Sequence, residues 1–306
     1  MSQPSGTGNR LLTACLAAVC LCAPRVGMAG DASCSAVAVR EPILWTAAGK
    51  SVESWDLRMT RRARLSVNPL PVAPLGLVAL PGDLALALCG SDGGFLISTR
   101  NSTPAWLAAP KPVLGAAERN GLLATACGGR GVFFFALTNP VAPVLLGGFS
   151  AASDARAVGF VASLACVADG ANGLKFLDAS QPTKPELVGV FAPVAQPSAD
   201  LLAISTTLIA TAHGKQVRLL DASDPRHPVV TATCDLPAEA RGMAAGKLHL
   251  WVACGLGGLV ELDMAHALKE LARHPTDGPA VAITAEGTRV FVAQGEGSWR
   301  ELSPAP

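Results

Sequence analysis

The stretch that decides the fold covers residues 157–191 and reads AVGFVASLACVADGANGLKFLDASQPTKPELVGVF. It contains four short apolar segments, which we predict to be β-strands at residues 157–161, 164–168, 174–177 and 187–191. Glycine and asparagine between the second and third segments accept positive φ and indicate a tight turn. The prolines between the third and fourth segments cannot donate to a β-ladder, so we expect a connection there.

This unit recurs along the whole chain. A short apolar strand followed by Ala-x-Gly, or by a looser version of it, places a glycine at positions 49, 90, 128, 170, 214, 255 and 295. The steps between successive glycines are 41, 38, 42, 44, 41 and 40 residues. Four short strands in about 40 residues, with no helical periodicity between them, are typical of a β-propeller blade. The sequence therefore predicts an all-β fold, a seven-bladed β-propeller of four-stranded repeats.

Closure of the ring is open at this point, because the last unit stops after a third strand at residues 299–302. Its outer strand is either supplied by residues 30–36 or absent. Since ring closure removes exposed sheet edges, we expect the two ends of the propeller to lie near each other.

A family resemblance lies in the same stretch. The segment Gly173-Leu174-Lys175-Phe176-Leu177-Asp178-Ala179-Ser180, followed by Pro182 and Pro185, resembles the LVIVD repeat. Residues 216–228 resemble this repeat nearly as well, and residues 131–143 and 258–263 do so in part. The resemblance implies a β-propeller in an exported or cell-surface protein, and it implies no shared enzymatic activity.

The first 29 residues have the features of a secretory signal peptide. Arg10 is the only charge before an apolar run at residues 11–23, and the small residues Gly27 and Ala29 follow that run. Thirteen apolar residues are too few for a membrane span, which needs about 20. We therefore predict a signal peptide at residues 1–29 and a single propeller domain at residues 30–306, without a membrane span. The alternative is lipoprotein anchoring at Cys15.

Composition and charge limit the classes of protein to which this chain can belong. Half of the 306 residues are apolar and 15% are charged, which excludes the low hydrophobicity and high net charge of disordered chains. Removing Arg10 and Arg25 with the leader takes the net charge from +1 to −1. A chain that binds nucleic acid carries a basic patch or stripe, so we expect no nucleic-acid partner. The predicted location is exported: periplasmic, cell-surface or secreted.

The cysteines favour buried thiols over a disulfide framework. Six of them follow the leader: Cys34, Cys89, Cys127, Cys166, Cys234 and Cys254. Three of these hold the same repeat position, and equivalent positions of neighbouring blades should lie about 10 Å apart, beyond the reach of a disulfide. We predict mostly small buried residues with at most one or two disulfides.

No pattern in the sequence indicates a metal or cofactor. The five histidines form no His-x-His or His-Glu-x-x-His pair, and there is no Cys-x-x-Cys. We therefore expect neither a metal site nor a cofactor. The aspartates that end the third strands, which are Asp56, Asp178, Asp221 and Asp263, are predicted to cap the following turn.

The candidate binding residues lie on one predicted face of the ring. In an up-down-up-down blade, the loop that enters the first strand and the turn after the second strand share a face. The polar residues of these loops and turns are Asp92, Arg130, Asp154, Arg156, Asp169, Asp200, His213, Glu239 and Arg241. Charged side chains on rigid loops suit recognition, although they could also be merely solvated. We predict a non-enzymatic scaffold that binds a protein or a glycan. The alternatives are a purely structural surface module and a hydrolase or lactonase with a metal at the channel mouth.

Overall fold

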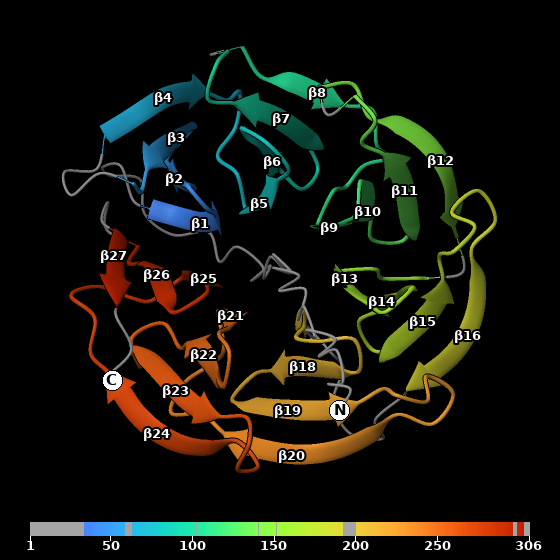
Figure 1. Cartoon of the computed structure of the whole chain (residues 1–306), viewed down its shortest axis with the longest axis vertical. Helices are drawn as coiled ribbons and strands as arrows, with labels where there is room; N and C mark the ends of the chain where they lie inside the picture. The colour runs from blue at the N-terminus through green and yellow to red at the C-terminus, as the bar shows by residue number, and fades with distance from the viewer. Residues whose placement is uncertain are drawn as a thin grey trace, which may run out of the picture.

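The chain forms a ring of seven antiparallel sheets around one axis (Figure 1). The computed structural model describes residues 34–58, 63–101, 103–139, 141–150, 152–191, 200–295 and 299–302, with only the backbone of Asp200. The predicted leader at residues 1–29 lies outside this part. Within the described residues there is no long apolar helix of the kind that crosses a membrane.

We number the sheets as blades 1 to 7 in chain order. In the first four blades the strands, from the axis outward, are β1 (Cys34–Arg40), β2 (Ile43–Ala48), β3 (Ser51–Asp56) and β4 (Ala63–Pro69); β5 (Gly76–Leu80), β6 (Leu84–Leu88), β7 (Gly94–Ser98) and β8 (Ala105–Leu107); β9 (Gly115–Arg119), β10 (Leu122–Ala126), β11 (Val132–Ala136) and β12 (Val144–Phe149); and β13 (Ala157–Val161), β14 (Leu164–Ala168), β15 (Leu174–Asp178) and β16 (Glu186–Phe191).

In the last three blades the strands are β17 (Asp200–Ala203), β18 (Leu208–His213), β19 (Gln216–Asp221) and β20 (Val229–Asp235); β21 (Gly242–Ala245), β22 (His249–Ala253), β23 (Leu259–Asp263) and β24 (Lys269–His274); and β25 (Ala282–Glu286), β26 (Arg289–Ala293) and β27 (Trp299–Leu302). The seven-bladed all-β prediction is confirmed, and the last blade has three strands among the described residues.

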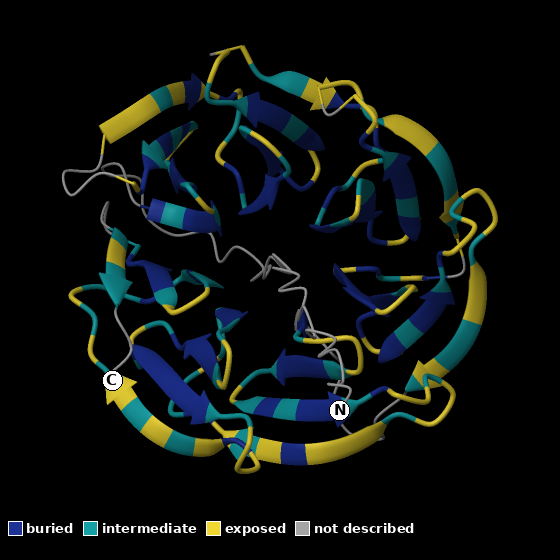
Figure 2. Cartoon of the chain, viewed as in Figure 1, coloured by how far each residue is buried: buried dark blue, intermediate teal, exposed yellow. Residues whose placement is uncertain are grey.

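The core lies between blades rather than inside one central body. The described residues contain seven buried apolar clusters, one at each boundary between neighbouring blades. Inner strands are buried on both faces, as β5 is throughout, whereas β24 alternates between exposed and half-buried residues (Figure 2). This burial explains why the inner strands are continuous runs of small and aliphatic residues.

Side-chain packing closes the ring. Cys34 and Leu44 of blade 1 share a cluster with Phe291 and Trp299 of blade 7. The rings of Trp55 and Trp299 meet edge to face, with centroids 6.0 Å apart. The described ends of the propeller therefore lie near each other, as predicted. Residues 34–36 belong to the inner strand of blade 1, so the expectation that they supply an outer strand to blade 7 is wrong. These residues cannot be the innermost strand of blade 1 and the outermost strand of blade 7 at the same time, because β1 pairs with β2 along its length.

The glycine turns are confirmed by their backbone conformation. All seven repeat glycines have a positive φ, between 51° and 66°, a region that glycine enters at little cost. Several of them also hold the connection to the next blade: Gly128 exchanges two backbone hydrogen bonds with Ala155, at 2.9 and 3.1 Å. The equivalent bridges join Gly90 to Val113 and Gly255 to Ala280.

The predicted aspartate caps are confirmed in four blades. The Oδ1 atom of Asp178 accepts a hydrogen bond from the Ser180 amide at 2.9 Å, and that of Asp221 accepts one from Ser223 at 2.8 Å. In the same way, the Oδ1 atom of Asp56 accepts a hydrogen bond from the Arg58 amide at 2.9 Å, and that of Asp263 accepts one from the Ala265 amide at 2.8 Å. In these four blades the carboxylate therefore orders the start of the loop between the third and fourth strands.

All six described cysteines are free thiols, and five of them are buried. Burial raises the pKa of Cys89 to about 12 and the pKa values of Cys127 and Cys254 to about 11. These thiols are therefore protonated at neutral pH and act as small core residues. Neither of the disulfides that the sequence left open is formed among them.

Candidate functional site

The entering loops and the turns after the second strands share one face of the ring. The backbone bridge between Gly128, in the turn of blade 3, and Ala155, in the loop that enters blade 4, brings the two kinds of segment side by side. We call this surface the turn face. The opposite surface, formed by the turns after the first strands and the proline loops, is called the hairpin face.

The predicted binding residues differ in how far they are exposed. Four of them are exposed on the turn face: Asp92, Arg130, Arg156 and Glu239. Three are half-buried, which are Asp154, His213 and Arg241, and Asp169 is fully buried. The side chain of Asp200 lies outside the described part. The turn face therefore presents charges from blades 2, 3, 4 and 6.

Asp169 has a structural environment. Its side chain is 0% exposed, and its carboxylate accepts a hydrogen bond from the Asp154 amide at 2.6 Å. The same carboxylate forms an ion pair with the Lys175 ammonium group. Arg156 in turn pairs with Asp154 at 2.8 Å. The Asp169 carboxylate thus ties the entering loop of blade 4 to its own turn, and the exposed member of this network is Arg156.

An exposed apolar residue lies among the charges of blade 6. Leu256, in the turn after β22, is 94% exposed. Its neighbour Gly255 lies against Arg241, which pairs with Glu239 at 3.2 Å. A glycan-binding surface rarely needs an exposed leucine, whereas protein interfaces combine apolar contacts with a charged rim. The sequence analysis did not single out Leu256, because an isolated leucine in a glycine-rich turn carries no pattern.

The hairpin face contains a pocket that the sequence analysis also missed. Its volume is about 410 Å³, within the usual range for small-molecule sites. The lining residues come from blades 3, 4 and 5: Arg119, Asn120, Leu122, Phe160, Ala162, Ser163, Ala179, Ser180 and Thr206. They come from four separate segments of the chain, so only the packing of the blades brings them together.

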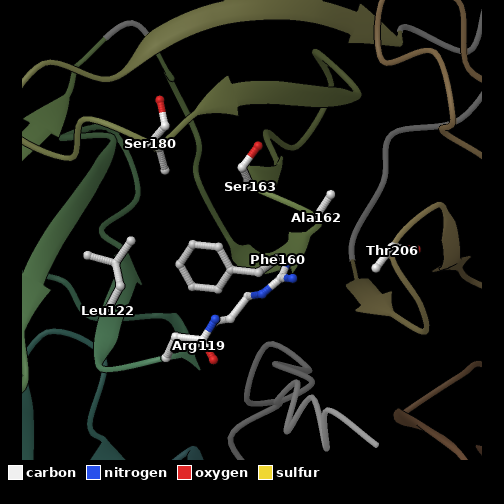
Figure 3. Close-up of a pocket in the computed structure, with 9 residues that line it drawn as sticks. Arg119, Leu122, Phe160, Ala162, Ser163, Ser180 and Thr206 are labelled. Carbon is white, nitrogen blue, oxygen red and sulfur yellow. The ribbon is translucent and has the colours of Figure 1, made fainter. Parts of the chain in front are cut away.

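Polar groups lie on two sides of this pocket. Figure 3 shows the Arg119 side chain below the Phe160 ring, with its nitrogen-bearing end toward Ala162. In the same view the hydroxyl groups of Ser163 and Ser180 lie on the other side of that ring. The pocket therefore combines one cation and several hydroxyls with an apolar wall, which suits a small polar ligand.

The described residues show no ready-made metal centre. No three His, Cys, Asp or Glu side chains in this part of the chain form a group that could hold a metal ion. Two histidines do converge on one carboxylate in blade 6, where His249 and His274 contact the two oxygens of Glu261 at 2.6 and 2.8 Å. One ring nitrogen of each histidine contacts the carboxylate itself, so the two imidazoles and Glu261 satisfy one another within blade 6.

Comparison with known proteins agrees with the geometry. Residues 154–192 match the LVIVD repeat family, and no curated protein matches the chain in sequence. Among solved structures, a chain of the mitotic checkpoint complex is 12% identical, with a TM-score of 0.72, over 94% of this chain and 98% of that one. The computationally designed protein Ika8 is 10% identical, with a TM-score of 0.64, over 90% of this chain and 97% of its own.

At these identities the structural likenesses support the fold alone. The family is supported by the matched repeat, which is blade 4, together with the six further blades of the same construction. This chain is a seven-bladed β-propeller whose fourth blade matches the LVIVD repeat family.

Proposed function

We propose that this chain is an exported, non-enzymatic scaffold that binds a protein or a glycan through its turn face. The observation that carries the proposal is the set of exposed side chains held there on bridged turns. Arg130 and Arg156 project from blades 3 and 4, and Leu256 with Glu239 from blade 6. Because the bridges hold these segments without a bound partner, little conformational entropy is lost on binding.

A protein is favoured over a glycan as the partner. The exposed Leu256 beside the Arg241–Glu239 pair provides an apolar contact with a polar rim, which is the usual organisation of a protein interface. Charges of both signs on this face would orient the partner and raise the association rate more than the final affinity.

A charge-reversal pair tests the proposal. In the test variant, Arg130→Glu and Arg156→Glu reverse two exposed charges of the turn face. In the control, Arg226→Glu reverses an exposed charge in a proline loop of the hairpin face. Both proteins are compared with the wild type on a glycan array and by affinity measurement against purified proteins of the host's exported fraction. Loss of binding in the turn-face variant alone supports the proposal, and equal binding by all three proteins contradicts it.

Export and the enzymatic alternative are tested in the same material. N-terminal sequencing of exported protein should begin near Gly30, whereas an intact Met1 or a lipid on Cys15 would contradict cleavage after Ala29. Elemental analysis of the purified protein tests the metal-dependent hydrolase, because a stoichiometric divalent metal would favour that alternative.

A further inference from the structure

We propose that the pocket between blades 3 and 4 on the hairpin face is a binding site for a small organic carboxylate. The ligand is of the size of an amino acid or a sugar acid, and Arg119 is its anchor. This site is separate from the turn face, so the proposal does not depend on the scaffold function.

Among the residues that the structure describes, the charge of Arg119 has no counterion. No described carboxylate forms an ion pair with it. The acid next to it in sequence, Glu118, is fully engaged elsewhere: one oxygen pairs with Arg40 of blade 1 at 2.7 Å, and the other accepts the Gly121 amide at 2.8 Å. Asp178, which ends β15 close to the pocket, accepts the Ser180 amide. The described lining of the pocket therefore contains a guanidinium group and no acid to neutralise it.

The hairpin of blade 4, which forms part of the pocket wall, has a strained backbone. The hairpin of blade 3 turns through Asn120 and Gly121, with φ values of 51° and 80°, and these residue types tolerate that region. The equivalent hairpin of blade 4 places Ala162 at a φ of 50°, where an alanine is disfavoured. Strained residues cluster at ligand sites, and Ala162 lines this pocket. Its small side chain leaves open the space that an asparagine would fill.

The chemistry of the walls selects the ligand. One guanidinium group binds one carboxylate through two parallel hydrogen bonds. A dianionic phosphate would favour a second cation, and the described lining contains none. The hydroxyls of Ser163 and Thr206 can donate to or accept from hydroxyl or amide groups of the ligand. The volume of about 410 Å³ is sufficient for a compact molecule.

Matched pairs of small molecules test the site by isothermal titration calorimetry. Glucuronate is compared with glucose, and N-acetylglutamate with N-acetylglutamine, so that each acid has a neutral analogue. We expect one acid to bind with a Kd of about 1 mM or tighter and its neutral partner to bind at least about tenfold more weakly. The acid that binds identifies the source as a sugar acid or an amino acid. Inorganic phosphate is the third probe.

Three variants separate the site from general effects on folding. Arg119→Gln removes the charge and should weaken acid binding at least about tenfold, with an unchanged melting temperature. Arg100→Gln changes an exposed arginine of blade 2 that does not line the pocket, and it should bind like the wild type. Ala162→Asn suits the positive φ, so it should keep or raise the melting temperature while its side chain obstructs the ligand.

Clear results would overturn the proposal. These are no binding of either acid, equal binding of acids and neutral analogues, unchanged binding by Arg119→Gln, or tighter binding of phosphate than of both acids. Loss of scaffold binding in the turn-face variant leaves this site untouched, so the two proposals fail independently.

Discussion

The middle of the third strand is apolar in blades 2 to 5 and polar in blades 6, 7 and 1. This position is the one paired with the middle of the second strand, and in blade order from 1 to 7 it holds Ser54, Leu96, Phe134, Phe176, Leu219, Glu261 and Glu301. The pairing of the second and third strands is the same in all seven blades, so the comparison shows which side chains this position accepts. It accepts an apolar side chain, or a polar side chain that has a hydrogen-bond or ion-pair partner.

The polar members all have partners. Glu261 is 5% exposed and contacts both His249 and His274. Glu301 pairs with Arg289 at 2.7 Å, and the hydroxyl of Ser54 bonds that of Ser66 at 2.6 Å. A carboxylate is therefore tolerated at this position because side chains of the neighbouring strands contact it, and not because it is exposed to water.

Removing the apolar residue should have the largest effect. Phe176→Ala deletes a fully buried ring from the boundary between blades 4 and 5. We expect the free energy of unfolding to fall by about 3–5 kcal/mol, since the cavity adds to the lost transfer energy. Urea unfolding followed by circular dichroism measures this. A loss below about 1 kcal/mol would mean that the ring is not packed as described.

Removing the polar residue should have a smaller effect. Glu261→Ala leaves two histidines that are partly exposed and can turn to water. We expect a loss of about 1.5–3 kcal/mol, the usual contribution of hydrogen bonds to a charged group. The control is Glu239→Ala, an exposed pair, for which about 0–1 kcal/mol is expected. Equal losses in the two variants, by the same urea titration, would show that the two-histidine network contributes nothing.

The glycine turn of blade 4 gives the next effect. Gly173 has a φ of 78°, and a β-branched side chain is strongly disfavoured there. Gly173→Val should cost on the order of 1–2 kcal/mol or more and lower the melting temperature visibly. Ala171→Val, at an exposed residue without positive φ, is the matched control. If both variants melt with the wild type, the turn does not impose its conformation.

The aspartate caps should give the smallest effect, visible only in acid. Hydrogen bonds from Arg58 lower the pKa of Asp56 from 3.8 to about 2. A lowered pKa stabilises the fold above the unfolded value, and this stability is lost as the pH falls from 3.8 through about 2. The melting temperature of Asp56→Asn should therefore fall less steeply over this range than that of the wild type. Identical slopes would contradict the assignment. Asp178 and Asp221 have lowered pKa values too, so part of the slope remains.

The strands of blade 4 show how far local pattern reaches. The predictions for residues 157–161 and 164–168 coincide with β13 and β14, and those for the third and fourth strands miss one residue each. Strand length, turn glycines and proline connections are local properties, repeated often enough to be counted. The number of blades follows from that count.

The candidate residues show where local pattern stops. Asp169 directly precedes its repeat glycine, a position at which Cys127 and Gln294 are also buried, whereas Arg130 lies two residues after its glycine and is exposed. The repeat pattern does not show that a carboxylate can be buried there. The Lys175 ammonium group makes this possible, because it pairs with Asp169 across the turn. Likewise, Arg119 and Ser180 are 61 residues apart in sequence and line one pocket only because blades 3 and 4 pack together.

The all-β repeat, the seven blades, the glycine turns and the aspartate caps could all be predicted from the sequence alone. All of these depend on φ preferences, strand periodicity and hydrogen bonds between residues close in the chain. The exposure of the turn-face charges depends on contacts of side chains inside one blade, as Asp169 shows with Asp154 and Lys175. How the ring closes, where the pocket lies and that Arg119 forms no ion pair with a described carboxylate became clear only from the folded chain. These last properties depend on contacts between blades, whose partners are separated by a whole repeat or, at closure, by the whole chain.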